Sequence, residues 1–188
     1  MISTVRLYLD IETFSEGEFK VSNTKVISIQ YKDSDGNITV LKEWESDEKT
    51  ILKRFHDHLL KLKNTGFIVV IGHNLLRFDI PILIHRMAVH NIDTYENLLD
   101  LHHSHIIAMD SLQCLLPFND FQVKGLNAVE LSRRLKIRAP KHKSTEIAQF
   151  YRNRQYDKIE EHILADLDFM EDLWRKLREK GSELHSLP

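Results

Sequence analysis

The stretch VRLYLDIETFS, residues 5–15, decides the fold and raises the first question about function. Its apolar start predicts a strand over residues 5–10 that is buried on both faces and is therefore central in a sheet. Asp10 and Glu12 then follow one residue apart. In an extended chain such residues point to the same side, so the two carboxylates aim at one point. Because like charges at one point repel, the pattern indicates either a metal ion between them or a solvated strand end.

The rest of the chain predicts further strands and helices around this strand. The turn signal SDGN, residues 34–37, indicates a hairpin, and Ser46 or Asp47 is the expected N-cap of the first helix. The predicted strands cover residues 25–33, 38–44, 66–74 and 105–110, and the predicted helices cover residues 46–62, 80–91, 126–137 and 159–179. Since hairpins precede the strand–helix–strand units, we expect an α/β fold with a five-stranded mixed sheet. Three antiparallel strands would join parallel ones, flanked by helices.

Composition limits the class of protein. The 188 residues, 42% hydrophobic and 29% charged, predict a single globular domain over residues 1–188 whose tail, about 181–188, frays. The net charge of −2 excludes a generally basic nucleic-acid coat, so a polyanion would need a local basic patch or metal ions. The single cysteine, the lack of a signal-peptide pattern and the short apolar runs predict a cytoplasmic protein with no membrane association.

Two more acids stand at the boundaries of predicted buried elements. Asp79 opens a helix in VVIGHNLLRFDIPIL, residues 69–83, where an ordinary helix-start acid is an equally good interpretation. In EEHILADLDFMEDLW, residues 160–174, His162 and Asp166 are four residues apart and share a helix face. Asp166 borders the apolar stripe, where an unpaired carboxylate is costly. The alternative is a solvated ion pair of small energy.

Taken together, these stretches resemble the DEDD 3′–5′ exonucleases of the ribonuclease-H-like fold, also called the DnaQ-like group. LDIET, residues 9–13, resembles the first motif. GHNLLRFDIPIL, residues 72–83, resembles the second motif in the form seen in proofreading domains of family B DNA polymerases. Residues 160–174 resemble the third motif, so the resemblance spans nearly the whole chain.

The resemblance implies a role for each of five residues. Asp10, Glu12, Asp79 and Asp166 match the acids that bind two divalent metal ions, Mg²⁺ or Mn²⁺. His162 matches the residue that orients or deprotonates the attacking water. The tyrosine branch of the family has Tyr at this position, and the histidine branch has His one residue further from the last acid. The pattern H-x-x-x-D therefore departs from both branches.

Contacts to a nucleic-acid substrate are predicted at five positions. The basic run SRRLKIRAPKHK, residues 132–143, contains Arg138 and Lys143, which we expect to hold the nucleic-acid backbone, with a solvated helix end as the alternative. The resemblance suggests that Phe14 stacks on the terminal base, although a core position is nearly as well supported. Thr13 and Asn74 are also expected to contact the nucleic acid. The alternative for Asn74 is that it only shapes a turn.

The expected activity is that of a metal-dependent exonuclease removing nucleotides from single-stranded 3′ ends, DNA rather than RNA, in DNA repair or replication-fork processing. A second resemblance, to small archaeal nucleases associated with the Hef helicase, implies a helicase partner and a homo-oligomer. Two alternatives stay open: a 3′–5′ exoribonuclease, and an inactive nucleic-acid-binding module. Intact acids at all four positions argue against the inactive module.

Overall fold

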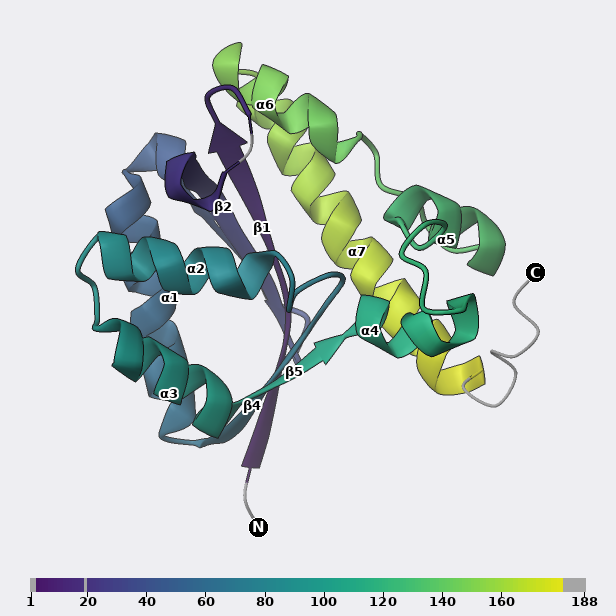
Figure 1. Ribbon diagram of the computed structural model, residues 1–188, viewed down its shortest axis with the longest axis horizontal. Coiled ribbons are helices and arrows are strands. Elements are labelled where there is room, and N and C mark those ends of the chain that lie inside the picture. Colours follow the sequence, from purple (N-terminus) through teal and green to yellow (C-terminus); the bar gives the residue numbers. More distant parts are fainter. Residues whose placement is uncertain (1–2, 19, 181–188) are drawn as a thin grey trace.

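A five-stranded mixed sheet forms the centre of the protein (Figure 1). The computed structural model describes residues 3–18 and 20–180. The strands lie in the order β3-β2-β1-β4-β5; β1 to β3 pair antiparallel, while β4 and β5 join β1 in parallel, as predicted. Their bounds are Ser3–Ser15 for β1, Thr24–Asp33 for β2, Ile38–Lys42 for β3, Gly66–Gly72 for β4 and Ile106–Asp110 for β5.

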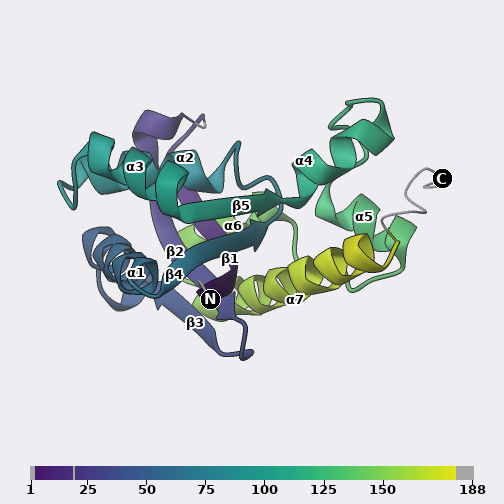
Figure 2. The same ribbon diagram turned by 90° about the horizontal axis from the view of Figure 1, so that it is seen from below.

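Helices cover both faces of the sheet: α1 to α3 lie on one face, α6 and α7 lie on the other, and α5 packs against α7 (Figures 1 and 2). Their bounds are Glu48–Lys63 (α1), Asp79–Val89 (α2), Tyr95–His105 (α3), Ser111–Leu115 (α4), Ala128–Leu135 (α5), Ser144–Arg152 (α6) and Tyr156–Lys180 (α7). Short 3-10 helices cover Val21–Asn23, Glu43–Glu45 and Leu116–Asn119. Each face has its own apolar core. Leu9 of β1 packs into the core beneath α1, and Tyr8 contacts the one beneath α7, as the alternation of a strand requires.

The length of β1 corrects the sequence prediction. The strand does not end at Asp10 but continues to Ser15, because it keeps its antiparallel pairing with β2 as far as Thr24. Its parallel partner β4 stops earlier, with Tyr8 and Ile71 as the last pair in the described chain. Asp10 and Glu12 therefore lie inside β1, on the part of the strand that extends beyond the end of its pairing with β4. An irregularity in the register follows directly after Glu12.

Most predicted elements are present, with shifted ends. Asp47 is the N-cap of α1, where its side chain accepts a hydrogen bond of 2.9 Å from Thr50 N. The third strand ends at Lys42 instead of residue 44 because the chain turns into a 3-10 helix there. Helices α3, α4 and α6 were not predicted. Helix α4 has five residues, and the residues described as buried are Leu98 and Leu101 in α3 and Ile147 and Phe150 in α6, so none of the three gives a strong apolar pattern. The predicted frayed tail, residues 181–188, lies outside the described residues.

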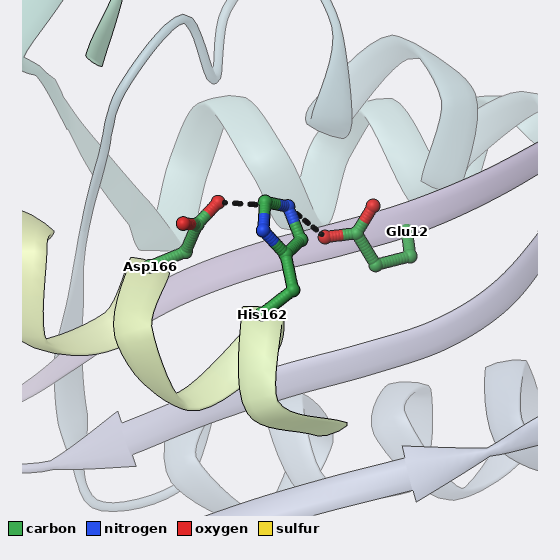
Figure 3. A group of neighbouring side chains, drawn as sticks. All are labelled: Glu12, His162 and Asp166. Carbon is green, nitrogen blue, oxygen red and sulfur yellow. Dashed lines mark ion pairs between the residues drawn. The ribbon is translucent and has the colours of Figure 1, made fainter. Parts of the chain in front are cut away.

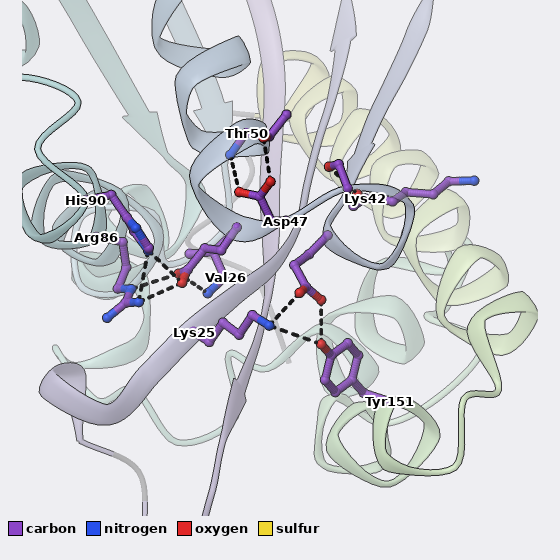
Figure 4. A network of polar contacts seen from close by, with 11 residues as sticks. Lys25, Val26, Lys42, Asp47, Thr50, Arg86, His90 and Tyr151 are labelled. Carbon is purple, nitrogen blue, oxygen red and sulfur yellow. Dashed lines mark hydrogen bonds and ion pairs between the residues drawn. The ribbon is translucent and has the colours of Figure 1, made fainter.

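The buried carboxylate of Glu48 ties α1 to the sheet and to α2 through Val26, Arg86 and His90, which are labelled in Figure 4. It accepts hydrogen bonds from Val26 N at 2.8 Å, from Arg86 Nε at 2.7 Å and from Arg86 Nη2 at 2.6 Å, and it contacts His90 Nε2 at 2.9 Å. Burial raises the pKa of Glu48, but the hydrogen bonds from Arg86 and Val26 outweigh burial and keep the pKa below its ordinary value. This ion pair therefore fixes the first helix against the strand that flanks β1.

Replacing Arg86 tests how much this network stabilises the fold. Arg86→Met would leave a buried carboxylate without its main partner, so we expect the free energy of unfolding to fall by about 3 kcal/mol. Lys53→Met is the matched control because its ion pair with Asp57 is exposed, and it should change stability by less than about 0.5 kcal/mol. Urea denaturation measures both variants. Equal losses would show that burial of the Glu48 pair does not matter.

Candidate active site

Four acids from three elements lie close together at the part of β1 that extends beyond the end of its pairing with β4. Asp10 and Glu12 come from β1, Asp79 from the first turn of α2, and Asp166 from α7. All four line one cleft of about 300 Å³. Glu12 and Asp79 are nearly inaccessible, with 7% and 3% of their surface exposed. The structure thus brings together the four acids that the sequence singled out.

The early end of β4 explains how acids from opposite faces reach one point. Asp10 and Glu12 project toward α7, whereas α2 packs on the other face of the sheet. The side chain of Asp79 accepts a hydrogen bond of 3.1 Å from Ile11 N. It thereby bonds the edge of β1 beyond the last pair with β4. On the other edge of β1, Gln30 of β2 donates a hydrogen bond of 2.6 Å to Asp10 Oδ2 and fixes the first acid.

The segment after β4 forms one wall of the cleft and is fixed by a fifth acid, Asp110. This buried carboxylate accepts hydrogen bonds from Asn74 N at 2.8 Å, Leu76 N at 3.0 Å and Leu112 N at 2.9 Å. Asn74 adopts a left-handed conformation, with φ of 67°, and lines the cleft. Asp110 therefore positions Asn74 in the cleft wall by accepting a hydrogen bond from its backbone N–H.

Sequence reasoning missed His73, which also lines the cleft. Both of its ring nitrogens are bonded: Nε2 donates to Leu126 O at 2.8 Å, and Nδ1 lies 2.9 Å from Ser111 Oγ. Burial lowers its pKa. The only local signal was its position directly after a buried strand and directly before Asn74, which does not distinguish it from an ordinary turn residue.

The ring of His162 lies between the carboxylates of Glu12 and Asp166 (Figure 3). Its Nε2 is 3.4 Å from Glu12 Oε1 and 3.3 Å from Asp166 Oδ2, and its side chain is 1% exposed. Within the described part of the chain neither ring nitrogen has a hydrogen-bond partner. Burial, with a smaller contribution from His142, lowers the pKa of His162 to about 4. The imidazole is therefore neutral at physiological pH.

Without a cation, ionising the four carboxyl groups together is unfavourable. Burial raises the pKa of Asp10 to about 6, and burial together with Asp10 raises the pKa of Asp166 to about 8. Burial and neighbouring carboxylates also raise the pKa values of Glu12 and Asp79 well above their ordinary range. A bound divalent ion would lower these pKa values, because it favours the ionised form of each acid. Clustered hard oxygen ligands fit Mg²⁺ or Mn²⁺, so the residues present suit the metal ions that the resemblance implies.

The residues predicted to contact substrate fall into two groups. Thr13 and Asn74 line the cleft beside the acids. Phe14 packs against Tyr151, with ring centroids 5.0 Å apart, and is partly buried against the core on the α7 side, which is the alternative offered by the sequence; its contact with a terminal base stays a prediction.

The two predicted basic contacts lie on the surface away from the cleft lining. Arg138 forms ion pairs with Asp168 at 2.5 Å and Asp172 at 2.7 Å, both on α7. Lys143 is exposed at the start of α6. Their roles in binding nucleic acid stay predictions.

Comparison with known proteins agrees with this fold. The family model described as "DNA polymerase family B, exonuclease domain" matches residues 11–113, a range that contains Glu12 and Asp79 but not Asp10, His162 or Asp166. The solved family B DNA polymerase from the hyperthermophilic archaeon Pyrobaculum calidifontis superposes with a TM-score of 0.69 at 17% identity. The alignment covers 97% of this chain and 26% of that polymerase. No curated protein matches the sequence.

Fold and site together define a DnaQ-like 3′–5′ exonuclease domain with the ribonuclease-H-like fold. Within that class, the chain belongs to the family of exonuclease domains of family B DNA polymerases. This membership supports a hydrolytic nuclease, and exonuclease domains of this kind use divalent metal ions. Among the described residues, no helix has an apolar stretch long enough to cross a bilayer.

Metal removal should make stability depend on pH. Asp10 and Asp166, with pKa values of about 6 and about 8 in the folded protein, have pKa values of about 3.9 when unfolded. The metal-free folded state thus binds more protons, so its stability is greatest at low pH and falls as pH rises through these folded values. We expect the Tm in EDTA to drop from about pH 4, near the unfolded pKa values, to about pH 8, near the highest folded value, and Mg²⁺ or Mn²⁺ to remove much of the drop.

Calorimetry at several pH values measures this effect, and Asp10→Asn provides the control. With one ionisable carboxylate fewer, the variant should lose less stability in EDTA as pH rises. Curves of Tm against pH that coincide with and without metal would contradict the electrostatic account of the site.

Proposed function

We propose that the protein is a two-metal-ion 3′–5′ exonuclease that hydrolyses phosphodiester bonds at the 3′ ends of single-stranded DNA. One observation carries the proposal: four carboxylates converge on a single open cleft from both faces of the sheet. Such a costly cluster is retained where it binds cations at a reaction centre. Hydrolysis would release nucleoside 5′-monophosphates one at a time.

The space next to the acids supports a polymeric substrate. A second cavity, of about 450 Å³, shares Asp10, Asn74 and Asp166 with the first and continues along α5 and α7. Arg77 lines this second cavity and offers a positive charge for a phosphate. The terminal nucleotide would lie beside Thr13 and Asn74, and the preceding nucleotides would extend toward Arg77.

The roles of the chain's own residues follow from their positions. Asp10, Glu12, Asp79 and Asp166 would hold the metal ions, which would activate water and stabilise the leaving 3′ oxygen. Gln30 fixes the carboxylate of Asp10, and the backbone of Ile11 fixes that of Asp79. These bonds hold the acids in place before substrate binds, which lowers the cost of assembling the site.

The wider setting rests on sequence patterns and resemblance alone. We place the enzyme in the cytoplasm, acting in DNA repair or at replication forks, with an archaeal helicase as partner and as a homo-oligomer. Arg138 and Lys143 would contact the backbone of the nucleic acid outside the cleft. RNA is the alternative substrate, because preference depends on whether the site accepts a 2′-hydroxyl.

A degradation time course tests the activity. DNA and RNA strands labelled at the 5′ end are incubated with the protein and Mn²⁺, Mg²⁺ or EDTA. We expect a ladder that shortens by single nucleotides, faster for DNA, and no cleavage in EDTA. Faster loss of RNA would identify an exoribonuclease. Binding of the folded protein to either strand without any cleavage would favour the inactive binding module.

Removing one acid tests the site assignment. Asp10→Ala should lower the cleavage rate at least about a thousandfold, because metal ions supply several kcal/mol of transition-state stabilisation. The fold should persist, since the change also removes repulsion between buried carboxylates. Asp57→Ala is the control: this acid of α1 forms an exposed ion pair with Lys53 and does not line the cleft, so activity should stay near that of the wild type. Full activity of Asp10→Ala would refute the assignment.

A further inference from the structure

The two histidines at the site differ in what their ring nitrogens do. His73 lines the cleft, but both of its nitrogens are already bonded, to Ser111 and Leu126. His162 is 1% exposed, and in the described residues both of its nitrogens lack a hydrogen-bond partner. An unsatisfied buried imidazole is unfavourable, so a native protein is expected to give it a partner. Only His162 has a lone pair available to the acid cluster.

The surroundings of His162 Nε2 fit a metal ion better than a second proton. The nitrogen lies 3.4 Å from Glu12 Oε1 and 3.3 Å from Asp166 Oδ2, without hydrogen-bond geometry to either (Figure 3). Adjacent ligand atoms on one ion, each about 2.0–2.2 Å from it, lie about 3.0–3.5 Å apart. One atom from each of the three residues lies within 4.8 Å of the others.

The position of the ring also bears on the role of His162. His162 does not itself line the cleft in the described structure, and its Nε2 reaches only as far as the cleft-lining carboxylates of Glu12 and Asp166. Imidazole is shorter than the tyrosine side chain found at this spacing in the family. Its nitrogen therefore ends beside the carboxylate oxygens, 3.4 Å from Glu12 Oε1 and 3.3 Å from Asp166 Oδ2.

We infer that His162 Nε2 is a direct ligand of a divalent metal ion that it shares with Glu12 and Asp166. The inference rests on the metal site of the proposed function and specifies it. Mg²⁺ takes oxygen ligands, whereas imidazole nitrogen suits transition-metal ions. One of the two metal positions should therefore bind Mn²⁺ in preference to Mg²⁺.

Mn²⁺ bound to the full-length protein gives a direct readout that does not depend on activity. Electron spin echo envelope modulation of the bound ion should show a directly coordinated ¹⁴N nucleus. Labelling histidine with ¹⁵N should replace that signal with one from ¹⁵N. This arm needs no variant, so it cannot fail through misfolding.

Variants assign the signal to one residue. His162→Phe removes the nitrogen, and His162→Tyr restores the Y-x-x-x-D spacing of the tyrosine branch. Both should lose the nitrogen signal and reduce the preference for Mn²⁺ over Mg²⁺ at least about tenfold, measured by competition for bound Mn²⁺. His142→Gln is the control, because this neighbouring ring lies 6.5 Å away and faces Glu161, and it should change neither result.

Several results would overturn the inference. Bound Mn²⁺ without a nitrogen signal would remove His162 from the ligands while leaving an all-oxygen exonuclease site intact. A nitrogen signal that persists in His162→Phe would assign the ligand to another residue. Failure of Mn²⁺ to bind at all would overturn both this inference and the metal requirement, and the EDTA arm of the degradation assay would show the latter independently.

Discussion

Repulsion among four buried carboxylates is the constraint on which the rest of this structure depends. The acids can meet only because β4 stops at Gly72 while β1 continues to Ser15. The uncovered edge of β1 then bonds Asp79 from one face, and Asp166 approaches from the other. The supporting contacts of Gln30 and Asp110 hold this arrangement from outside the cleft. Contacts from β1, β2 and β5 thus support one electrostatically costly site.

Sequence reasoning succeeded where short-range periodicity determines geometry. The period of two along a strand placed Asp10 and Glu12 together, and the period of the helix placed Asp166 one turn after His162. The mixed sheet followed from the order of hairpins and crossover units. Each of these inferences needs only residues close together in the chain.

The rest depended on partners far apart in the sequence. The length of β1 beyond its last pair with β4 depends on where β4 stops. In the sequence, the acids interrupt the apolar run of β1, so the predicted strand ended at Asp10. Phe14 packs against Tyr151 and Arg138 pairs with two acids of α7, and neither contact is visible in the sequence near these residues. His73 gave no signal because its partners, Ser111 and Leu126, belong to later segments.

The acids lie close together although they come from the first strand and the last helix of the described chain. An ion bound among them would therefore hold distant parts of the chain together. An ion held by β1, α2 and α7 would bind only the native state, so its binding free energy would add to stability as the free concentration rises. Digestion by proteases depends on how often the chain opens. The abundance of the protein would then follow the cellular supply of divalent metal, independently of any substrate.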